Sequence, residues 1–276
     1  DLELYQAREE AERFIGFIRE RTGLLNEQGQ DCYAFVHKTF QEYLCAQEVI
    51  YQADNEDDFE IILNHINSHL HDSHWREVLL LLISQQKPKK AVKAIQAILE
   101  YKSDYEQWLH RDLFFAAECL TENIKDLAVT DFSLSTRIIS KLIDLEIDYS
   151  TGFIHGVKNL AFETLCKLGE TEFQTQALKL LQGIEDQIES VRFQKYRYAL
   201  GEQESAVEKL IYLSKDDTFD TRSEATVALG ELGDASEKIA SLLVSLLQDD
   251  NSDLYFSAVW ALGKLGNSSE NVITIL

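Results

Sequence analysis

The sequence KDDTFDTRSEATVALGELG at residues 215–233 aligns with QDDNSDLYFSAVWALGKLG at residues 248–266 at an offset of 33. The identical pairs are Asp216/Asp249, Asp217/Asp250, Asp220/Asp253, Ala225/Ala258, Ala228/Ala261, Leu229/Leu262, Gly230/Gly263, Leu232/Leu265 and Gly233/Gly266. Self-similarity at a fixed period of this length is the signature of a helical repeat array. We therefore interpret residues 203–276 as helix-pair repeats with a period of 33 residues.

Each stretch contains the small and turn-forming residues that stacked helix pairs require. Alanines on one face let a neighbouring helix approach closely, and a glycine after the last turn supplies the positive φ that ends a helix. The residues that define the repeat are Ala225, Ala228, Gly230, Gly233, Ala258, Ala261, Gly263 and Gly266. Thr221 and Glu224 form a capping pair typical of a helix start. Residues 239–247 add the apolar stripe of a second helix, and such hairpins must stack to bury both faces.

The same pattern recurs more loosely upstream. Leu168 and Gly169 lie 64 residues before Leu232 and Gly233, close to two periods, whereas the similar residues 198–201 fall out of register. Pro88 is the single proline, which favours long helices over a sandwich or barrel. From about residue 55 we predict ten to thirteen antiparallel helices, with divergent helical repeats at 54–202 before the regular repeats at 203–276.

The first fifty residues differ from the repeats. Residues 2–21 have the periodicity of an amphipathic helix that Gly23 ends, and residues 24–25 and 32–36 flank a polar turn as in a β-hairpin. A second helix from His37 to about Tyr51 follows, with Phe40, Tyr43, Leu44 and Val49 available for packing. Helix, wing and helix form the end of a winged-helix module over residues 1–53. The predicted fold class is all-α: an α-α superhelix preceded by a partial winged-helix segment with a short β-hairpin.

Two motifs give this segment a family resemblance. RERTGLL at residues 19–25 and YAFVHKTFQEYLCA at residues 33–46 resemble the end of the NACHT module of STAND-type NTPases, where Cys45 departs from the usual small residue. Residues 203–276 resemble HEAT repeats, and weaker likeness extends over much of the chain between the two.

The resemblance implies a signalling role. In such proteins the NACHT core binds ATP or ADP, the repeats recognise a protein or other macromolecular trigger through their concave face, and release of the ADP-bound state permits oligomerisation of the full-length protein. Bacterial members are linked to antiphage defence. The chain's partners would be its own NACHT core and the trigger. The histidine matching His37 contacts the β-phosphate of ADP in the family, although a polar residue that caps or packs at a helix start remains the alternative for His37.

The chemistry of an enzyme is missing from the sequence. No GxxxxGK[ST] motif occurs, so we expect no nucleotide hydrolysis and no cofactor in this chain, with ATP or ADP held by the NACHT core of a parent ATPase. Asp1 and the absence of Met lead us to expect a piece of a longer polypeptide. The rival hypothesis is a stand-alone HEAT-like scaffold or chaperone that resembles phycobilin lyase subunits, but that class has no reason to carry residues 19–46.

The charge and the amino-acid composition limit the classes of partner that we expect for this chain. The formal net charge of −22 repels phosphate backbones and argues against nucleic acid, and no apolar run is long enough for a membrane span. Four scattered cysteines without a CxxC favour a reducing, cytoplasmic setting. Histidine is a common zinc ligand, and four histidines lie close together in the sequence: His65, His69, His71 and His74. We interpret this cluster as a solvated turn between two helices and predict no metal site. The aromatic residues at helical core spacing are Trp108, Phe114, Phe115, Tyr255 and Trp260. We expect them in the core, with a place in a concave groove that anchors a partner as the alternative for Tyr255 and Trp260.

Overall fold

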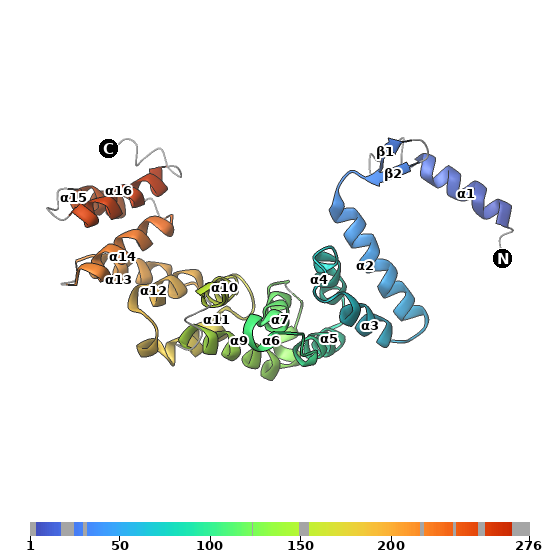
Figure 1. Cartoon of the computed structure of the whole chain (residues 1–276), viewed down its shortest axis with the longest axis horizontal. Helices are drawn as coiled ribbons and strands as arrows, with labels where there is room; N and C mark the ends of the chain where they lie inside the picture. The colour runs from blue at the N-terminus through green and yellow to red at the C-terminus, as the bar shows by residue number, and fades with distance from the viewer. Residues whose placement is uncertain are drawn as a thin grey trace. The chain divides into compact units, whose positions relative to one another are not determined.

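The computed structural model describes residues 4–17, 25–29, 32–122, 124–148, 155–215, 218–233, 236–247 and 252–266. These ranges contain sixteen α-helices, a short 3-10 helix and one two-stranded sheet (Figure 1). The predicted all-α class with a short hairpin is therefore confirmed. No helix within these ranges is both long and apolar enough to cross a bilayer. The chain divides into two compact units, residues 1–103 and 104–276. The predicted domain boundaries after residues 53 and 202 stay predictions.

The first unit opens with the helix, hairpin and helix that the sequence predicts. Their bounds are α1 Leu4–Phe17, β1 Leu25–Gly29, β2 Cys32–Phe35 and α2 Lys38–Asn55. The strands pair antiparallel, with Leu25 opposite Phe35 and an irregular register near Gly29. α2 runs past the predicted end at Tyr51, because Ala53 is still buried in the core. Residues 18–24, with Gly23 and most of the first motif, lie outside the described ranges.

Three more helices complete the core of the first unit: α3 Glu60–His69, α4 Arg76–Ser84 and α5 Pro88–Glu100. α2 contacts α3 and α4, and α5 contacts the same two helices. Pro88 stands at the first turn of α5, where its missing N–H leaves no helical hydrogen bond unmade. The buried residues of this core include Ala46, Val49, Ile62, Ile66, Leu79, Leu82, Ile83, Ala91, Ala94, Ile95 and Ile98.

The second unit consists of helices joined by short turns. They are α6 Glu106–Leu109, α7 Arg111–Thr121, α8 Leu127–Thr130, α9 Phe132–Ile147, α10 His155–Cys166, α11 Gln174–Gln182, η3 Glu185–Gln187, α12 Ser190–Ala199, α13 Gln203–Leu213, α14 Phe219–Glu231, α15 Glu237–Leu246 and α16 Ser252–Gly266. In the described ranges fourteen α-helices follow residue 55, and α6 and α8 are single turns. The twelve longer ones lie within the predicted number.

Alternate helices of the second unit form one continuous row. α7, α10, α12, α14 and α16 contact one another in that order, and α9, α13 and α15 each pack beside a member of the row (Figure 1). Buried apolar residues from α12 to α16 merge into a single cluster that includes Val191, Leu210, Leu229, Leu243 and Leu262. A row of first helices with second helices alongside is the arrangement expected of stacked helix hairpins.

A leucine–glycine pair closes every helix of the row from α10 onward. The pairs begin at Leu168, Leu200, Leu232 and Leu265, at spacings of 32, 32 and 33 residues. The prediction that residues 198–201 fall out of register is therefore wrong, because one turn differs by a single residue while the helix ends correspond. Gly233 has φ +71°, the left-handed conformation predicted for it.

α14 and α16 approach each other closely at Gly230. A Cβ added to Gly230 would lie 2.5 Å from the Ala261 Cα and 2.7 Å from the Ala261 Cβ, so the two backbones meet where neither residue has more than a methyl group. Ser223 and Ser257 hydrogen bond across the same contact at 2.8 Å. Ala225, Ala228 and Ala258 are fully buried alongside, which is the role predicted for the small residues of the repeat.

Two expectations about the repeats are wrong. Thr221 is not the cap of α14, because the Arg222 amide already donates to the Thr218 carbonyl at 3.2 Å and the helix begins at Phe219. Tyr255 and Trp260 are not in the core but 42% exposed, since they face outward from the last described helix of the row.

The other three aromatic residues that we predicted in the core differ in their exposure. Phe115 is buried and Phe114 half-buried in α7. Trp108 is 58% exposed, because α6 is a single turn that does not bury a face. Asp216, Asp217, Asp249 and Asp250, the acidic pairs of the repeat, lie outside the described ranges.

The close contact at Gly230 gives a matched pair of substitutions. We expect Gly230→Ala to lower the free energy of unfolding by about 1–3 kcal/mol, because the new methyl group overlaps the backbone of α16. Gly263→Ala, at the corresponding position of α16, meets nothing within 4 Å and should raise stability by about 0.5–1 kcal/mol through helix propensity. Urea denaturation of both variants measures the difference, and equal shifts for the two would contradict the contact.

Candidate functional site

His37 lies directly before α2, in extended backbone with φ −120° and ψ 129°. Its exposed imidazole makes no capping hydrogen bond, and its ring centroid is 6.1 Å from that of Phe40. The first turn of α2 has no acidic residue, and Lys38 there pairs with Glu42 at 2.9 Å. An exposed imidazole beside the positive end of a helix is an arrangement that favours an anion.

α2 is apolar on two sides, of which one is covered in the described residues. Ala46, Val49 and Ala53 recur at helical spacing and are buried in the core of the first unit. Phe40, Tyr43 and Leu44 form a second apolar set and are 41%, 47% and 50% exposed. Of the four residues predicted to pack, Val49 alone is buried. We refer to Phe40, Tyr43 and Leu44 as the open face of α2.

The open face begins one turn after His37. Val36, 42% exposed, precedes the histidine, so exposed apolar side chains flank it on both sides in the sequence. A helix that is apolar all round is normally buried, and a contiguous exposed apolar set marks an interaction surface. Imidazole and apolar face thus occupy the same end of α2.

The predicted turn between two helices is confirmed for His71 and His74, which lie between α3 and α4, but is wrong for the other two histidines, which pack on Trp75. His65 and His69 belong to α3, and the His69 ring stacks on Trp75 with a centroid distance of 3.9 Å and an interplanar angle of 4°. Burial, and then the nearby charge of His69, lowers the pKa of His65. His74 pairs with Asp72 instead. Within the described ranges no three His, Cys, Asp or Glu side chains are grouped to hold a metal ion.

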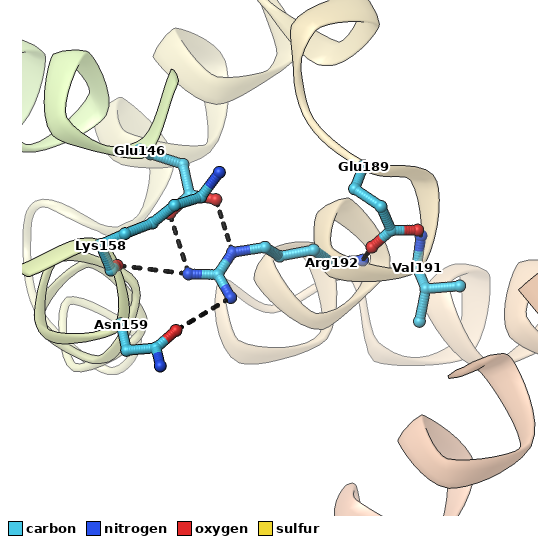
Figure 2. Close-up of polar contacts among 6 residues, drawn as sticks. All are labelled: Glu146, Lys158, Asn159, Glu189, Val191 and Arg192. Carbon is cyan, nitrogen blue, oxygen red and sulfur yellow. Dashed lines mark hydrogen bonds and ion pairs between the residues drawn. The ribbon is translucent and has the colours of Figure 1, made fainter. Parts of the chain in front are cut away.

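A second polar constellation joins three helices of the second unit (Figure 2). Arg192 on α12 donates through Nε and Nη2 to the two carboxylate oxygens of Glu146 on α9, the latter at 3.0 Å. Its guanidinium also donates to the Lys158 carbonyl at 3.2 Å and to Asn159 Oδ1 at 3.5 Å, both on α10. The ring of Phe162 lies under the guanidinium, 4.3 Å from Cζ. One side chain therefore ties α9, α10 and α12 together.

Burial makes this ion pair costly to break. The side chain of Glu146 is 1% exposed and that of Arg192 23% exposed. Burial opposes the charge of Arg192, but the hydrogen bond and negative charge of Glu146 outweigh it, so the pKa of Arg192 is raised. Glu189 caps α12 by accepting from the Val191 and Arg192 amides at 2.7 and 2.8 Å, which fixes the turn that carries Arg192.

Groups beside the ion pair are unsuited to catalysis. Cys166 lines an open hollow of about 460 Å³ between the turns after α10 and α12, and burial raises its pKa to about 12. Because the thiolate is the nucleophile, this thiol is inert at neutral pH. Burial likewise raises the pKa of Tyr196. The cluster is a structural clamp.

Sequence reasoning did not single out this clamp. Glu146 and Arg192 are 46 residues apart, and no spacing rule joins an acid and a base at that separation. The available signal was the leucine–glycine frame, which aligns Arg192 with Ser257 and Asn159 with Ser223. Since Ser223 and Ser257 touch between α14 and α16, the frame predicts that Asn159 and Arg192 touch between α10 and α12.

Comparison with protein families agrees with this architecture. Residues 2–49 match the winged helix-turn-helix domain C-terminal to NACHT, and residues 207–276 match HEAT repeats. A comparison with curated proteins gave no match, and neither did one with solved structures. Fold and matches define a winged-helix segment followed by stacked helical repeats. Residues 2–49 are therefore a winged-helix segment of the kind that lies C-terminal to NACHT modules, and residues 207–276 are HEAT repeats.

The clamp predicts a large effect from one substitution. Arg192→Met should lower the free energy of unfolding by about 3 kcal/mol, because it leaves the buried Glu146 carboxylate without a partner. Arg197→Met is the matched control on the same helix: Arg197 pairs with the more exposed Glu202 at 2.6 Å, and we expect a loss of under about 1 kcal/mol. Thermal or urea unfolding measures both.

The double variant Glu146→Leu/Arg192→Met tests whether the loss of stability comes from the unpaired charge or from lost side-chain packing. It should recover most of the loss, since two apolar residues leave no unpaired charge. A double variant as unstable as Arg192→Met alone would show that the ion pair is not the cause.

Proposed function

We propose that this chain is the sensor and interaction arm of a NACHT-type signalling NTPase. It restrains the nucleotide-bound switch through its winged-helix segment and recognises a protein or other macromolecular trigger through its repeats. The observation that carries the proposal is the open face of α2 beside the exposed His37, in a domain whose family lies C-terminal to NACHT.

The open face supplies the restraint. Phe40, Tyr43 and Leu44 expose apolar area that the NACHT core would cover in the resting state, and each side chain buried this way contributes up to about 1.5–3 kcal/mol. Docking along this face brings the start of α2 against the core. His37 and the amides of the first turn then meet the phosphates of ADP bound there.

The nucleotide belongs to the NACHT core in this proposal. ATP or ADP binds there and hydrolysis takes place there, while this chain contributes His37 as a contact that favours the ADP-bound form. In this proposal the chain stabilises the ADP-bound form of the NACHT core and does not itself catalyse nucleotide hydrolysis.

The repeats supply the sensor. Stacked helix hairpins offer an extended surface that single domains lack, and the net charge of −22 favours a trigger whose contact surface is basic or neutral. Binding of such a trigger would compete with the packing of the winged-helix segment on the core, and release would permit assembly of the full-length protein. We place this signalling in the cytoplasm, in the antiphage setting that the family resemblance suggests.

The stand-alone scaffold hypothesis has less support. A scaffold or chaperone has no reason to carry a winged-helix segment at residues 2–49. It also gives no reason for the open face of α2 to lie beside an exposed histidine.

The proposal predicts loss of bound nucleotide from one substitution. In the polypeptide that includes the NACHT core, His37→Ala should speed ADP dissociation by about 10- to 100-fold, the value of a hydrogen bond to a charged group at about 1.5–3 kcal/mol. Release of a fluorescent ADP analogue during a chase with unlabelled ADP measures the rate.

The control is His74→Ala, an exposed histidine of the same unit that pairs with Asp72. It should leave ADP release unchanged. Leu44→Asp should speed release as His37→Ala does, because a charge on the open face prevents docking on the core. ADP release unaffected by both His37→Ala and Leu44→Asp would refute the proposed restraint.

A further inference from the structure

The turns that follow α10, α12 and α14 border two adjacent hollows on one edge of the repeats. The first hollow, of about 460 Å³, lies between the ends of α10 and α12, and its lining includes Lys167 and Glu170. The second hollow, of about 620 Å³, lies between the ends of α12 and α14. Tyr198 and Gln203 line both hollows. We refer to the two hollows and their shared wall as the edge groove.

The edge groove carries more negative than positive charge. Glu204 and Glu208 lie one helical turn apart on α13 and line the second hollow together with Lys238. All three side chains are exposed to solvent. α10, α12 and α14 also end at this edge, so the negative ends of three helix dipoles lie beside the groove. The groove therefore favours a cationic ligand.

The spacing of the two hollows matches one backbone conformation. One hollow follows the other along the row by a single helix, and packed helices lie about 8–10 Å apart. A polyproline II segment has three residues per turn and rises about 3.1 Å per residue. Its side chains at positions i and i+3 therefore point the same way at about the separation of the hollows.

Tyr198 gives the shared wall an aromatic surface. Its hydroxyl group donates to the Leu232 carbonyl at 3.4 Å, which holds the side chain between α12 and the end of α14. The side chain is half-buried, so part of it stays accessible from the groove. Proline-rich segments dock in aromatic-lined grooves because their polyproline II backbone is already ordered before binding. The shared wall thus suits a backbone that crosses from one hollow to the other.

We propose that the edge groove binds an extended basic segment of a separate protein, in the polyproline II conformation, with arginine or lysine at positions i and i+3. One cationic side chain enters each hollow, toward Glu170 in the first and toward Glu204 and Glu208 in the second. The residues between them lie on Tyr198. The chain's own basic residues 87–90 do not fit, because they form the start of a helix. The proposal names the chemical class of the trigger and rests on the sensor role proposed for the repeats.

Fluorescence anisotropy of a labelled peptide tests the groove directly. The probe has the core Arg-Pro-Pro-Arg, and the control peptide has the same composition in the order Arg-Arg-Pro-Pro. Both are titrated with the whole chain at low ionic strength, where contacts between exposed charges are least screened. The probe should bind about tenfold more tightly, because the control peptide places only one of its two cations in a hollow.

Two variants should change the affinity in opposite directions. Glu204→Gln/Glu208→Gln should weaken binding of the probe about tenfold, because it removes the acceptors of one cation. Lys238→Glu should tighten binding about threefold, since it replaces a repelling charge with an attracting one, and a gain of affinity does not arise from poor folding. The matched control Glu185→Gln/Asp186→Asn removes two exposed charges that line neither hollow and should leave binding unchanged.

Three results would overturn the proposal. The first is equal affinity for the two peptides, because the acidic chain would then attract any cation. The second is a Lys238→Glu variant that binds the probe no better than the unmodified chain does. The third is displacement of the probe by spermidine as readily as by unlabelled peptide, since the groove would then take a small polycation. These measurements contain no nucleotide, so their failure leaves the restraint at His37 to be judged by ADP release.

Discussion

Close approach between successive helices of one row is the constraint on which the second unit depends. At the contact of α14 with α16 it is met by removing side chains, since Gly230 and Ala261 leave room for the two backbones. At the contact of α10 with α12 it is met by large side chains that are fully paired, with Arg192 bound to Glu146 and stacked on Phe162. Successive helices can therefore pack closely either through small residues or through a paired charged residue. Close packing would be lost if Arg192 or Glu146 had no partner, or if Gly230 carried a methyl group.

In the first unit, by contrast, helix α2 has more apolar surface than the neighbouring described helices cover. α2 buries one face through Ala46, Val49 and Ala53, while Phe40, Tyr43 and Leu44 stay exposed on another. An exposed apolar face next to His37 is expected of a winged-helix segment that packs against a second domain. The open face of α2 therefore combines exposed apolar residues with an imidazole beside an anion-favouring helix start.

Much of the fold could be predicted from the sequence, because repetition and turn residues are local signals. The alignment of residues 215–233 with 248–266 identified the repeats, and the hairpin before His37 identified the wing. Exposure was harder to predict: helical periodicity places Trp260 on an apolar side of α16 but does not reveal whether another helix covers that side. The Glu146–Arg192 clamp was missed for a related reason, since its register depends on turns that differ by one residue between repeats. His37 was found through a family resemblance, and the structure adds that its imidazole caps nothing.

The central claim is that successive helices of the row meet through one shared interface, and a disulfide tests it directly. Ser223→Cys and Ser257→Cys, introduced together, should oxidise to a cross-link between α14 and α16 in the folded protein, because the two hydroxyl oxygens lie 2.8 Å apart. Peptide mapping by mass spectrometry should find this pair linked in nearly every molecule, with the helical content unchanged. A pair that stays reduced under native conditions, or that links only after unfolding, would contradict the account.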